Sequence, residues 1–240
     1  MESLSKNKIK WIRSLQKKKN RDAEGLFIIE GEKMVLELID LWPEYIELLC
    51  TSDANFKCSL DCHITDERTL KELSLLQNTN RLLAIARKPK LSSKTNAEFI
   101  VALDNIQDPG NMGTILRTCD WYNVDKIICS KNTVDIFNAK VIQSSMGSIY
   151  RIPVEYRDLG TFLQTSDLPI FGAFLEGENI YKEDLIRKGI IVMGNEGKGI
   201  SSEIEKLITK AIHIPRFGGA ESLNVSIATG IILSEFCRNN

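Results

Sequence analysis

The sequence predicts an α/β protein whose larger part is a parallel sheet with helices on both faces. From residue 26 onward, short apolar runs of strand length alternate with runs of helical periodicity. Such alternation is typical of parallel sheets, because the crossover between two parallel strands is usually a helix. The glycine-rich and polar loops of the second half follow strand-like runs, at the carboxyl ends where parallel sheets bind ligands.

The N-terminal half is expected to form a smaller α/β domain. The polar, aperiodic stretch RKPKLSSKTNAE at residues 87–98 has the composition of an interdomain linker. We therefore expect a domain over residues 1–88, a linker over 89–98 and a second domain over 99–240. In the first domain, strands are expected at LFIIE (26–30), YIELLC (45–50), CHIT (62–65) and RLLAIA (81–86), and helices at GEKMVLELIDL (31–41) and DERTLKELSLLQ (66–77).

The second domain is expected to continue the alternation of strands and helices. Strands are expected at FIVALD (99–104), KIICS (126–130), LPIFGAF (168–174), IIVMG (190–194) and AIHIP (211–215). Helices are expected at about 112–122, 138–146, 158–166, 202–209 and 222–237.

The composition excludes several classes of protein. No run of about 18 apolar residues occurs, so no transmembrane helix is expected. The N-terminus is too charged for a secretory signal, so we expect a cytoplasmic protein with no membrane partner. The 6 cysteines contain no CxxC pair and are accompanied only by His63 and His213, so we expect free thiols and no metal site.

The N-terminal arm holds a concentrated positive charge. The net charge of the chain is −1, yet residues 1–21 carry eight Lys or Arg and one acid, which leaves the remainder strongly acidic. A basic arm on an acidic body indicates a polyanionic partner. Leu4, Trp11 and Leu15 follow helical spacing, so we expect an amphipathic helix; the alternative is a solvated helical face that binds nothing. The candidate RNA-binding residues are Lys17, Lys18, Lys19 and Arg21.

The stretch DNIQDPGNMGTILRTCD (104–120) leaves a strand and enters a helix. Its glycines permit tight turns near a ligand, and Asn111 is expected to cap the helix. Two roles are open for Arg117: its side chain either donates bidentately to a phosphate or pairs with Asp108 or Asp120.

The stretch GNEGKGIS (194–201) exposes backbone N–H groups through its glycines. It does not match the P-loop pattern, because Gly199 rather than Ser or Thr follows the lysine. Glu196 lies between glycines and is not expected in a core. Ser202 with Glu205 has the spacing of a capping box for the next helix.

The stretch IPRFGGAESLNVSIATG (214–230) leads into the final helix. Ser222 is expected at the N-cap of this helix, with Asn224 in its first turn. Capping explains one polar residue. It does not explain why Asn224 and Ser226 stand at the start of an otherwise apolar run.

Together these stretches resemble the three ordered motifs of the SpoU (TrmH) family of RNA ribose 2′-O-methyltransferases, within the SPOUT superfamily. The motifs are DPGNMGTILRT (108–118), IVMGNEGKGIS (191–201) and IPRFGGAESLNVSIATGIILSE (214–235). Each is modest alone, but the ordered set is specific. SLQKKKNRDAEGLFIIEGEKMVLELI (14–39) is similar, less specifically, to the family's smaller substrate-binding domain, which is related to a ribosomal-protein fold.

The resemblance implies features that periodicity does not show. The second domain would contain a deep trefoil knot, in which the C-terminal segment threads an earlier loop. The protein would be a homodimer that uses S-adenosylmethionine, acts on RNA and needs no metal. The catalytic residues implied by the resemblance are Arg117, Asn111, Glu196, Ser222 and Asn224, and the cofactor-binding residues are Gly194, Ile214, Leu223 and Asn224.

The family's mechanism implies activation of a ribose hydroxyl near Arg117. Arginine is effectively never deprotonated in proteins. We therefore expect Arg117 to position an RNA phosphate and polarise the hydroxyl rather than remove its proton. Glu196 is expected to orient Arg117 or groups of the substrate. The aromatic content of 7% argues against recognition by base stacking, so RNA is expected to be read by shape and backbone.

Ribosomal RNA is the favoured substrate, because the sizeable N-terminal domain matches family members of that type by analogy. One alternative is a transfer-RNA ribose 2′-O-methyltransferase, which differs only in its target. Another is a non-catalytic RNA-binding protein that keeps the fold. A nucleotide-dependent phosphoryl transferase lacks both a Walker pattern and a clear magnesium carboxylate.

Overall fold

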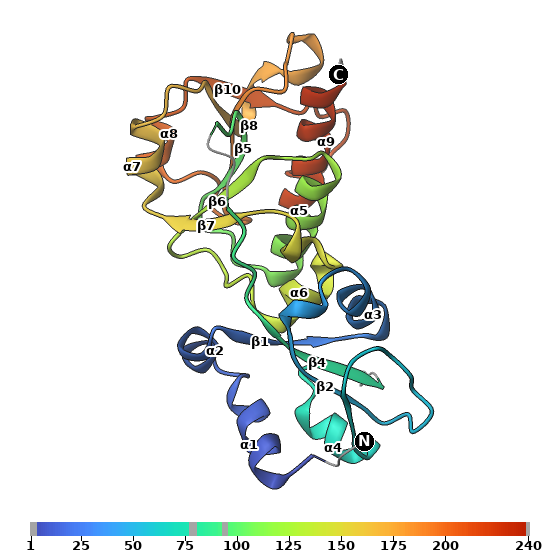
Figure 1. Cartoon of the computed structure of the whole chain (residues 1–240). Helices are drawn as coiled ribbons and strands as arrows, with labels where there is room; N and C mark the ends of the chain where they lie inside the picture. The colour runs from blue at the N-terminus through green and yellow to red at the C-terminus, as the bar shows by residue number, and fades with distance from the viewer. Residues whose placement is uncertain (1–3, 77–80, 93–95, 239–240) are drawn as a thin grey trace. The chain divides into compact units, whose positions relative to one another are not determined.

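The computed structural model describes residues 4–76, 81–92 and 96–238, which form two compact units; most of their helices and strands are labelled in Figure 1. One unit comprises Met1–Lys90 with Phe137–Gly147, and the other comprises Leu91–Ile136 with Ser148–Asn240. Residue 77, the last of the helix expected at 66–77, and part of the expected linker lie outside the described residues; the helix itself ends earlier than expected, at Leu73. In the described part of the chain, no helix is long and apolar enough to cross a membrane.

The first unit is built on a mixed sheet whose strands lie where the sequence predicts them. They are β1 (Leu26–Glu30), β2 (Ile46–Thr51), β3 (Cys62–Ile64) and β4 (Leu82–Arg87), and their order in the described sheet is β1-β4-β2-β3. β4 pairs antiparallel with both β1 and β2, whereas β2 and β3 are parallel. The helices of this unit are α1 (Lys6–Ser14), α2 (Lys18–Glu24), α3 (Glu32–Leu41), η1 (Pro43–Tyr45), α4 (Glu67–Leu73) and α6 (Ala139–Ser145).

The segment Phe137–Gly147 belongs to the first unit by its contacts, although it comes late in the sequence. The ring centroids of Phe27 and Phe137 lie 4.9 Å apart. Nζ of Lys88 lies 4.6 Å from the ring centroid of Phe137. Aromatic packing and a cation–π contact therefore hold this segment against β1 and the end of β4.

The amphipathic helix predicted in the N-terminal arm is confirmed as α1, and a second short helix, α2, follows it. Ile12 and Leu15 are fully buried. They join Leu70 and Leu73 of α4 in one hydrophobic cluster. Burial of each such side chain stabilises the unit by about 1.5–3 kcal/mol.

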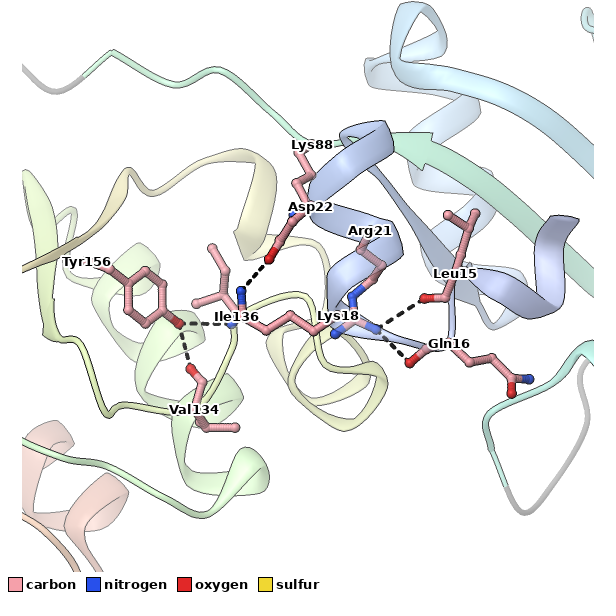
Figure 2. A network of polar contacts seen from close by, with 9 residues as sticks. All are labelled: Leu15, Gln16, Lys18, Arg21, Asp22, Lys88, Val134, Ile136 and Tyr156. Atoms are coloured by element: carbon pink, nitrogen blue, oxygen red, sulfur yellow. Dashed lines mark hydrogen bonds and ion pairs between the residues drawn. The ribbon is translucent and has the colours of Figure 1, made fainter.

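Arg21 is a structural residue, contrary to the prediction that it binds RNA. Its side chain is buried, and its Nη1 donates to the carbonyl oxygens of Leu15 at 3.1 Å and Gln16 at 2.8 Å (Figure 2). A buried guanidinium must keep such acceptors, because an unpaired buried charge is costly. Arg21 therefore closes the turn between α1 and α2.

The second unit confirms the predicted parallel sheet. Its strands are β5 (Phe99–Leu103), β6 (Lys126–Ser130), β7 (Val154–Arg157), β8 (Ile170–Asn179), β9 (Gly189–Met193) and β10 (Lys210–His213). Their order in the described sheet is β10-β8-β9-β5-β6-β7, and every pair is parallel. Every residue of β5 and β9 is buried, as expected for strands at the centre of a covered sheet.

Helices cover both faces of this sheet. The helices are α5 (Pro109–Trp121), η2 (Ser148–Tyr150), α7 (Leu159–Gln164), η3 (Ile180–Lys182), α8 (Ser202–Glu205) and α9 (Val225–Cys237). Ile100 packs in a cluster with Leu159 of α7. On the opposite face, the ring of Phe236 in α9 lies 5.9 Å from that of Phe99 and 5.0 Å from that of Phe171. Phe99 and Ile100 are consecutive in β5, so their side chains point to opposite faces.

Three elements of the second unit differ markedly from the prediction: β7, α8 and β8, which runs to Asn179 instead of ending at residue 174. β7 was not predicted, because only its first residue is aliphatic. Its Tyr156 fixes the strand to the preceding loop: the hydroxyl donates to the Val134 carbonyl at 2.5 Å and accepts from the Ile136 N–H at 3.0 Å (Figure 2). The helix expected at 202–209 ends at Glu205. Its N-cap is Ser201, which makes no side-chain capping bond, so the predicted capping box is wrong.

Candidate functional site

Three loops meet at the carboxyl edge of the parallel sheet in the second unit. They follow β5, β9 and β10, whose carboxyl ends share one edge because the strands are parallel. Asn111, in the first turn of α5, joins them. Its Nδ2 donates to Oε1 of Glu196 at 3.1 Å, and its Oδ1 accepts from Nδ2 of Asn224 at 2.9 Å. The structure thus brings together three predicted site residues from three separate stretches.

Glu196 holds the loop that follows β5. Its carboxylate accepts from the backbone N–H of Gln107 at 3.2 Å and of Asp108 at 3.1 Å, in addition to the Asn111 side chain. In the described part of the chain it makes no hydrogen bond or ion pair with Arg117. Of the two roles expected for Glu196, the contact with Arg117 is not formed; Glu196 instead contacts Asn111 and the loop after β5, and its contact with groups of the substrate stays a prediction.

The ionised form of Glu196 is favoured by these donors. Partial burial raises the pKa of this carboxyl, but hydrogen bonds from its own N–H, Asn111, Asp108 and Gln107 outweigh burial and lower the pKa overall. A lowered pKa in the folded state means that the ionised carboxylate stabilises the fold. This stabilisation is complete above the ordinary glutamate pKa and is lost as the pH falls through the lowered value.

We expect Glu196→Gln to destabilise the protein at neutral pH, by about 1 kcal/mol because the carboxylate is exposed to solvent. The amide keeps the shape of the side chain but turns one acceptor into a donor that faces backbone N–H groups. The difference from the wild type should shrink in acid, where the wild-type carboxyl is itself protonated. Urea unfolding at about pH 7 and about pH 3 measures both effects. A difference independent of pH would show that the charge has no part in holding the loops.

Two helix caps differ from the sequence prediction. Asp108, not Asn111, caps α5, because its Oδ1 accepts from the Asn111 N–H at 2.8 Å. Asn224, not Ser222, caps α9, because its Oδ1 accepts from the N–H and the hydroxyl of Ser226 at 2.9 and 2.7 Å. These caps leave the side-chain amide of Asn111 and Nδ2 of Asn224 for the contacts of the site.

The loop after β9 is a tight turn that requires glycine at position 194. Asn195 and Gly199 exchange two backbone hydrogen bonds of 2.9 Å. Oδ1 of Asn195 also accepts from the N–H groups of Gly197 and Lys198, each at 3.0 Å. A Cβ on Gly194 would lie only 2.2 Å from the carbonyl carbon of Gly199. The chain is therefore in backbone-to-backbone contact where the sheet ends.

Asn105, Gln107 and Asn195 were not predicted as site residues, yet they tie the first two loops together. Nδ2 of Asn195 donates to the Asn105 carbonyl at 2.8 Å, and Nε2 of Gln107 donates to Oδ1 of Asn105 at 2.7 Å. Asn105 has a φ of 61°, in the left-handed region that Asn tolerates better than most residues. The sequence did contain a signal for two of these residues, because Asn105 and Asn195 each directly follow a predicted strand, where Asn commonly forms turns.

Residues 214–224 connect β10 to α9 without forming a helix or strand. Within the described chain, no backbone N–H from 216 to 223 donates to a backbone carbonyl. Leu223 is 48% exposed, Ser222 is exposed, and Ile214 is half-buried. Ser222 makes no hydrogen bond to the Asn111 cluster among the described residues. This segment therefore offers both donors and acceptors of its backbone to a ligand.

Arg117 lies on the exposed side of α5. Thr114 and Trp121 share this side, at spacings of three and four residues. Asp108 and Asp120, its suggested partners, are engaged elsewhere: Asp108 caps α5, and Asp120 accepts from the Ser148 hydroxyl at 2.7 Å. Over the described residues, Arg117 forms no hydrogen bond or ion pair, so its guanidinium is free to bind a substrate.

The fold and the candidate site define an α/β protein in which backbone groups, side-chain amides and a carboxylate from three loops gather at the carboxyl edge of a parallel sheet. The chain belongs to the SpoU rRNA Methylase family, whose family model matches residues 98–234, more than half of its length. A second family model, the MRM3-like substrate binding domain, matches residues 6–84.

Several known proteins are similar to this chain over nearly its whole length. RlmP of Bacillus subtilis, named as a 23S rRNA (guanosine(2553)-2′-O)-methyltransferase, is 28% identical over 97% of this chain and 97% of that protein. A structure from Porphyromonas gingivalis, described as an RNA methyltransferase of the TrmH family, has 34% identity and a TM-score of 0.85, with 99% of each chain covered. The AdoMet-bound rRNA methyltransferase of Sinorhizobium meliloti has 29% identity and a TM-score of 0.82, covering 100% of this chain and 97% of that one.

Proposed function

We propose that this protein is an S-adenosylmethionine-dependent methyltransferase that modifies a ribose 2′-hydroxyl in ribosomal RNA. The observation that carries the proposal is the link through Asn111, which joins all three motif loops at one sheet edge. Family membership, the 2′-O-methyltransferase name of RlmP and the AdoMet-bound relative support the reaction and the cofactor.

The chain's own groups fit this cofactor. An adenine edge needs donors and acceptors side by side, and backbone N–H and C=O groups supply both. Gly194 brings the end of β9 close to the loop, while Ile214 and Leu223 lie in the segment whose backbone is open. When bound, S-adenosylmethionine supplies a methyl group that is already activated on sulfur. The protein therefore has to align the hydroxyl with that methyl group, and this requires no metal.

Arg117 is the residue assigned to the RNA. Its free, exposed guanidinium can donate in parallel to a phosphate and to the attacking hydroxyl, which stabilises negative charge as that oxygen reacts. It does not accept the proton, because arginine remains protonated. The proton leaves to phosphate or water. Asn111, Ser222 and Asn224 hold groups of the RNA or the cofactor by hydrogen bonds.

The proposal includes a fold with a deep trefoil knot in the second unit and a first unit of the ribosomal-protein type. The match of the whole chain to TrmH-family structures supports both features. An experimental trace in which the segment before α9 passes outside the 194–201 loop would remove the knot.

A homodimer through α5 and α9 also belongs to the proposal. These helices pack together, and each exposes a large apolar side chain: Trp121 is 84% exposed and Ile227 is 56% exposed. Sedimentation should give twice the mass of the 27.1 kDa chain. An active monomer would contradict this assignment.

The function is tested with methyl-labelled S-adenosylmethionine and total RNA from cells that lack this protein. After incubation, ribose methylation is mapped by resistance to alkaline cleavage. Label at one position of large ribosomal RNA is the expected result. Label in transfer RNA would keep the chemistry and overturn the substrate. Absence of both label and cofactor binding would favour a non-catalytic RNA-binding protein.

A further inference from the structure

The solvent side of α1 carries a row of cations at helical spacing. Lys6, Lys10 and Arg13 are exposed, and they are separated by four and three residues. Side chains at these spacings lie one above another on a single face of a helix. The opposite face of α1 is anchored in the core through Ile12, so the direction of this face is fixed. We call these three residues the basic row; the turn that ends α1 adds Lys17, which is also exposed.

The fold does not use the basic row. Among the described residues, none of its three members makes a side-chain hydrogen bond or an ion pair. Two neighbouring lysines behave differently. Nζ of Lys8 lies 3.0 Å from Nε2 of His63, and Nζ of Lys18 lies 2.6 Å from Oδ2 of Asp22, an ion pair that Figure 2 shows. Together with the buried Arg21, these cations have structural partners, which the row lacks.

The placement of Lys6 and Lys10 is unfavourable for the isolated protein, whereas Arg13, in the last turn of α1, is favourably placed for the helix dipole. Lys6 stands in the first turn of α1, which contains no acidic residue, although the positive end of a helix favours anions. Lys6 and Lys10, and likewise Lys10 and Arg13, are like-charge pairs at spacings that destabilise a helix. Within the fold alone, the charge of Lys6 in the first turn and its proximity to Lys10 are therefore unfavourable, whereas an anion lying along the helix would make both favourable.

The chemistry of the row selects the phosphate backbone rather than the bases. The one aromatic residue of α1, Trp11, is partly buried against the core, and its Nε1 donates to Glu24 at 2.8 Å. α1 therefore presents no exposed aromatic ring beside the row on which an unpaired base could stack. Double-helical RNA shields its bases and presents ordered phosphates, so it matches a row of cations without rings.

We infer that Lys6, Lys10 and Arg13 form a docking surface for the phosphate backbone of double-helical RNA. This inference rests on the proposed function, because it assigns part of the substrate to the first unit. It differs from the surface expected from sequence, since Arg21 is buried and Lys18 already faces an acid, Asp22, that offsets its charge. The row fixes where the RNA lies and carries no base specificity.

The experiment measures binding of the full-length protein to a labelled RNA hairpin and to a single strand of the same length, over a series of salt concentrations. The variant Lys6→Gln/Lys10→Gln/Arg13→Gln should bind the hairpin more weakly. The slope of log K against log salt should fall by about three, one for each lost phosphate contact. The matched control, Lys18→Gln, removes the same kind of charge from a paired site and should keep the wild-type slope. An unchanged slope in the triple variant overturns the inference, as does a loss confined to the single strand.

A second variant separates docking from folding. Lys6→Glu places an acid in the first turn of α1 and removes a like-charge pair, so the thermal midpoint should rise while the affinity for the hairpin falls. Effects in the same direction would mean that the residue acts on the fold and would overturn the inference. Failure of the proposed function is distinguishable. In that case the wild type transfers no methyl group, yet its hairpin binding still depends on the row.

Discussion

Replacing Gly194 with alanine is expected to abolish cofactor binding. The added Cβ would lie 2.2 Å from the carbonyl carbon of Gly199 and 2.3 Å from the nitrogen of Ile200. Both atoms belong to backbone, which cannot rotate away as a side chain can. The substitution must therefore break the paired hydrogen bonds between Asn195 and Gly199 or push the end of β9 out of register. Overpacking of this kind costs about 1–3 kcal/mol in stability, and the displaced loop loses its backbone geometry altogether.

Gly197→Ala is the matched control in the same loop. There the nearest heavy atom to the new Cβ is Oδ1 of Asn195, at 3.8 Å, which is an ordinary contact. Calorimetric titration with S-adenosylmethionine should give near wild-type affinity for Gly197→Ala and no measurable binding for Gly194→Ala. Circular dichroism establishes that both variants are folded. Normal affinity in a folded Gly194→Ala variant would remove this loop from the cofactor site.

Arg117→Ala is expected to lower the rate of methyl transfer by about 10²- to 10³-fold, the usual effect of losing one donor to a developing oxyanion. Cofactor affinity should remain close to that of the wild type, because the guanidinium is exposed and has no partner among the described residues. Because Arg117 is exposed and unpaired among the described residues, we also expect Arg117→Ala to change the thermal stability little. Single-turnover rates with labelled cofactor, together with the titration used for the glycine variants, separate the two effects.

Arg117→Lys is the informative comparison for this position. Lysine keeps the charge but lacks the planar fork that donates to two oxygens at once. A rate between those of the wild type and the alanine variant would support bidentate positioning. Substantial turnover by Arg117→Ala would contradict any direct role of this side chain in the reaction.

The composition of the loops predicted which stretches form the candidate site, but it did not predict which of their residues contact one another. Glycines and isolated polar residues after apolar runs marked all three stretches, and parallel strands bring such loops to one edge. The sequence could not show that Asn111 is the common partner of Glu196 and Asn224, because each contact joins residues that are far apart in the chain. The Asp-Pro pair at 108–109 did contain the correct cap of α5, since proline favours the first helical position.

The sequence also could not predict which charged side chains are buried. Arg21 follows three lysines and has the same formal charge, so nothing local distinguishes it from them. Only the fold shows that it donates to two carbonyl oxygens of the preceding turn. The strand β7 escaped prediction for a related reason. It lies at the edge of the sheet, where exposed Tyr156 and Arg157 are tolerated and the apolar signature of a central strand is absent.

The strand order of the second unit has a consequence for the protein during its synthesis. β5 is wholly buried, yet one of its two neighbours, β9, is encoded much later in the chain. A ribosome that has released β5 and β6 must still make most of the remaining unit before the central strand is enclosed. For that interval an apolar strand edge is exposed, and such edges aggregate. The nascent chain therefore has a long vulnerable period, during which a chaperone that binds extended apolar segments would be of most use to it.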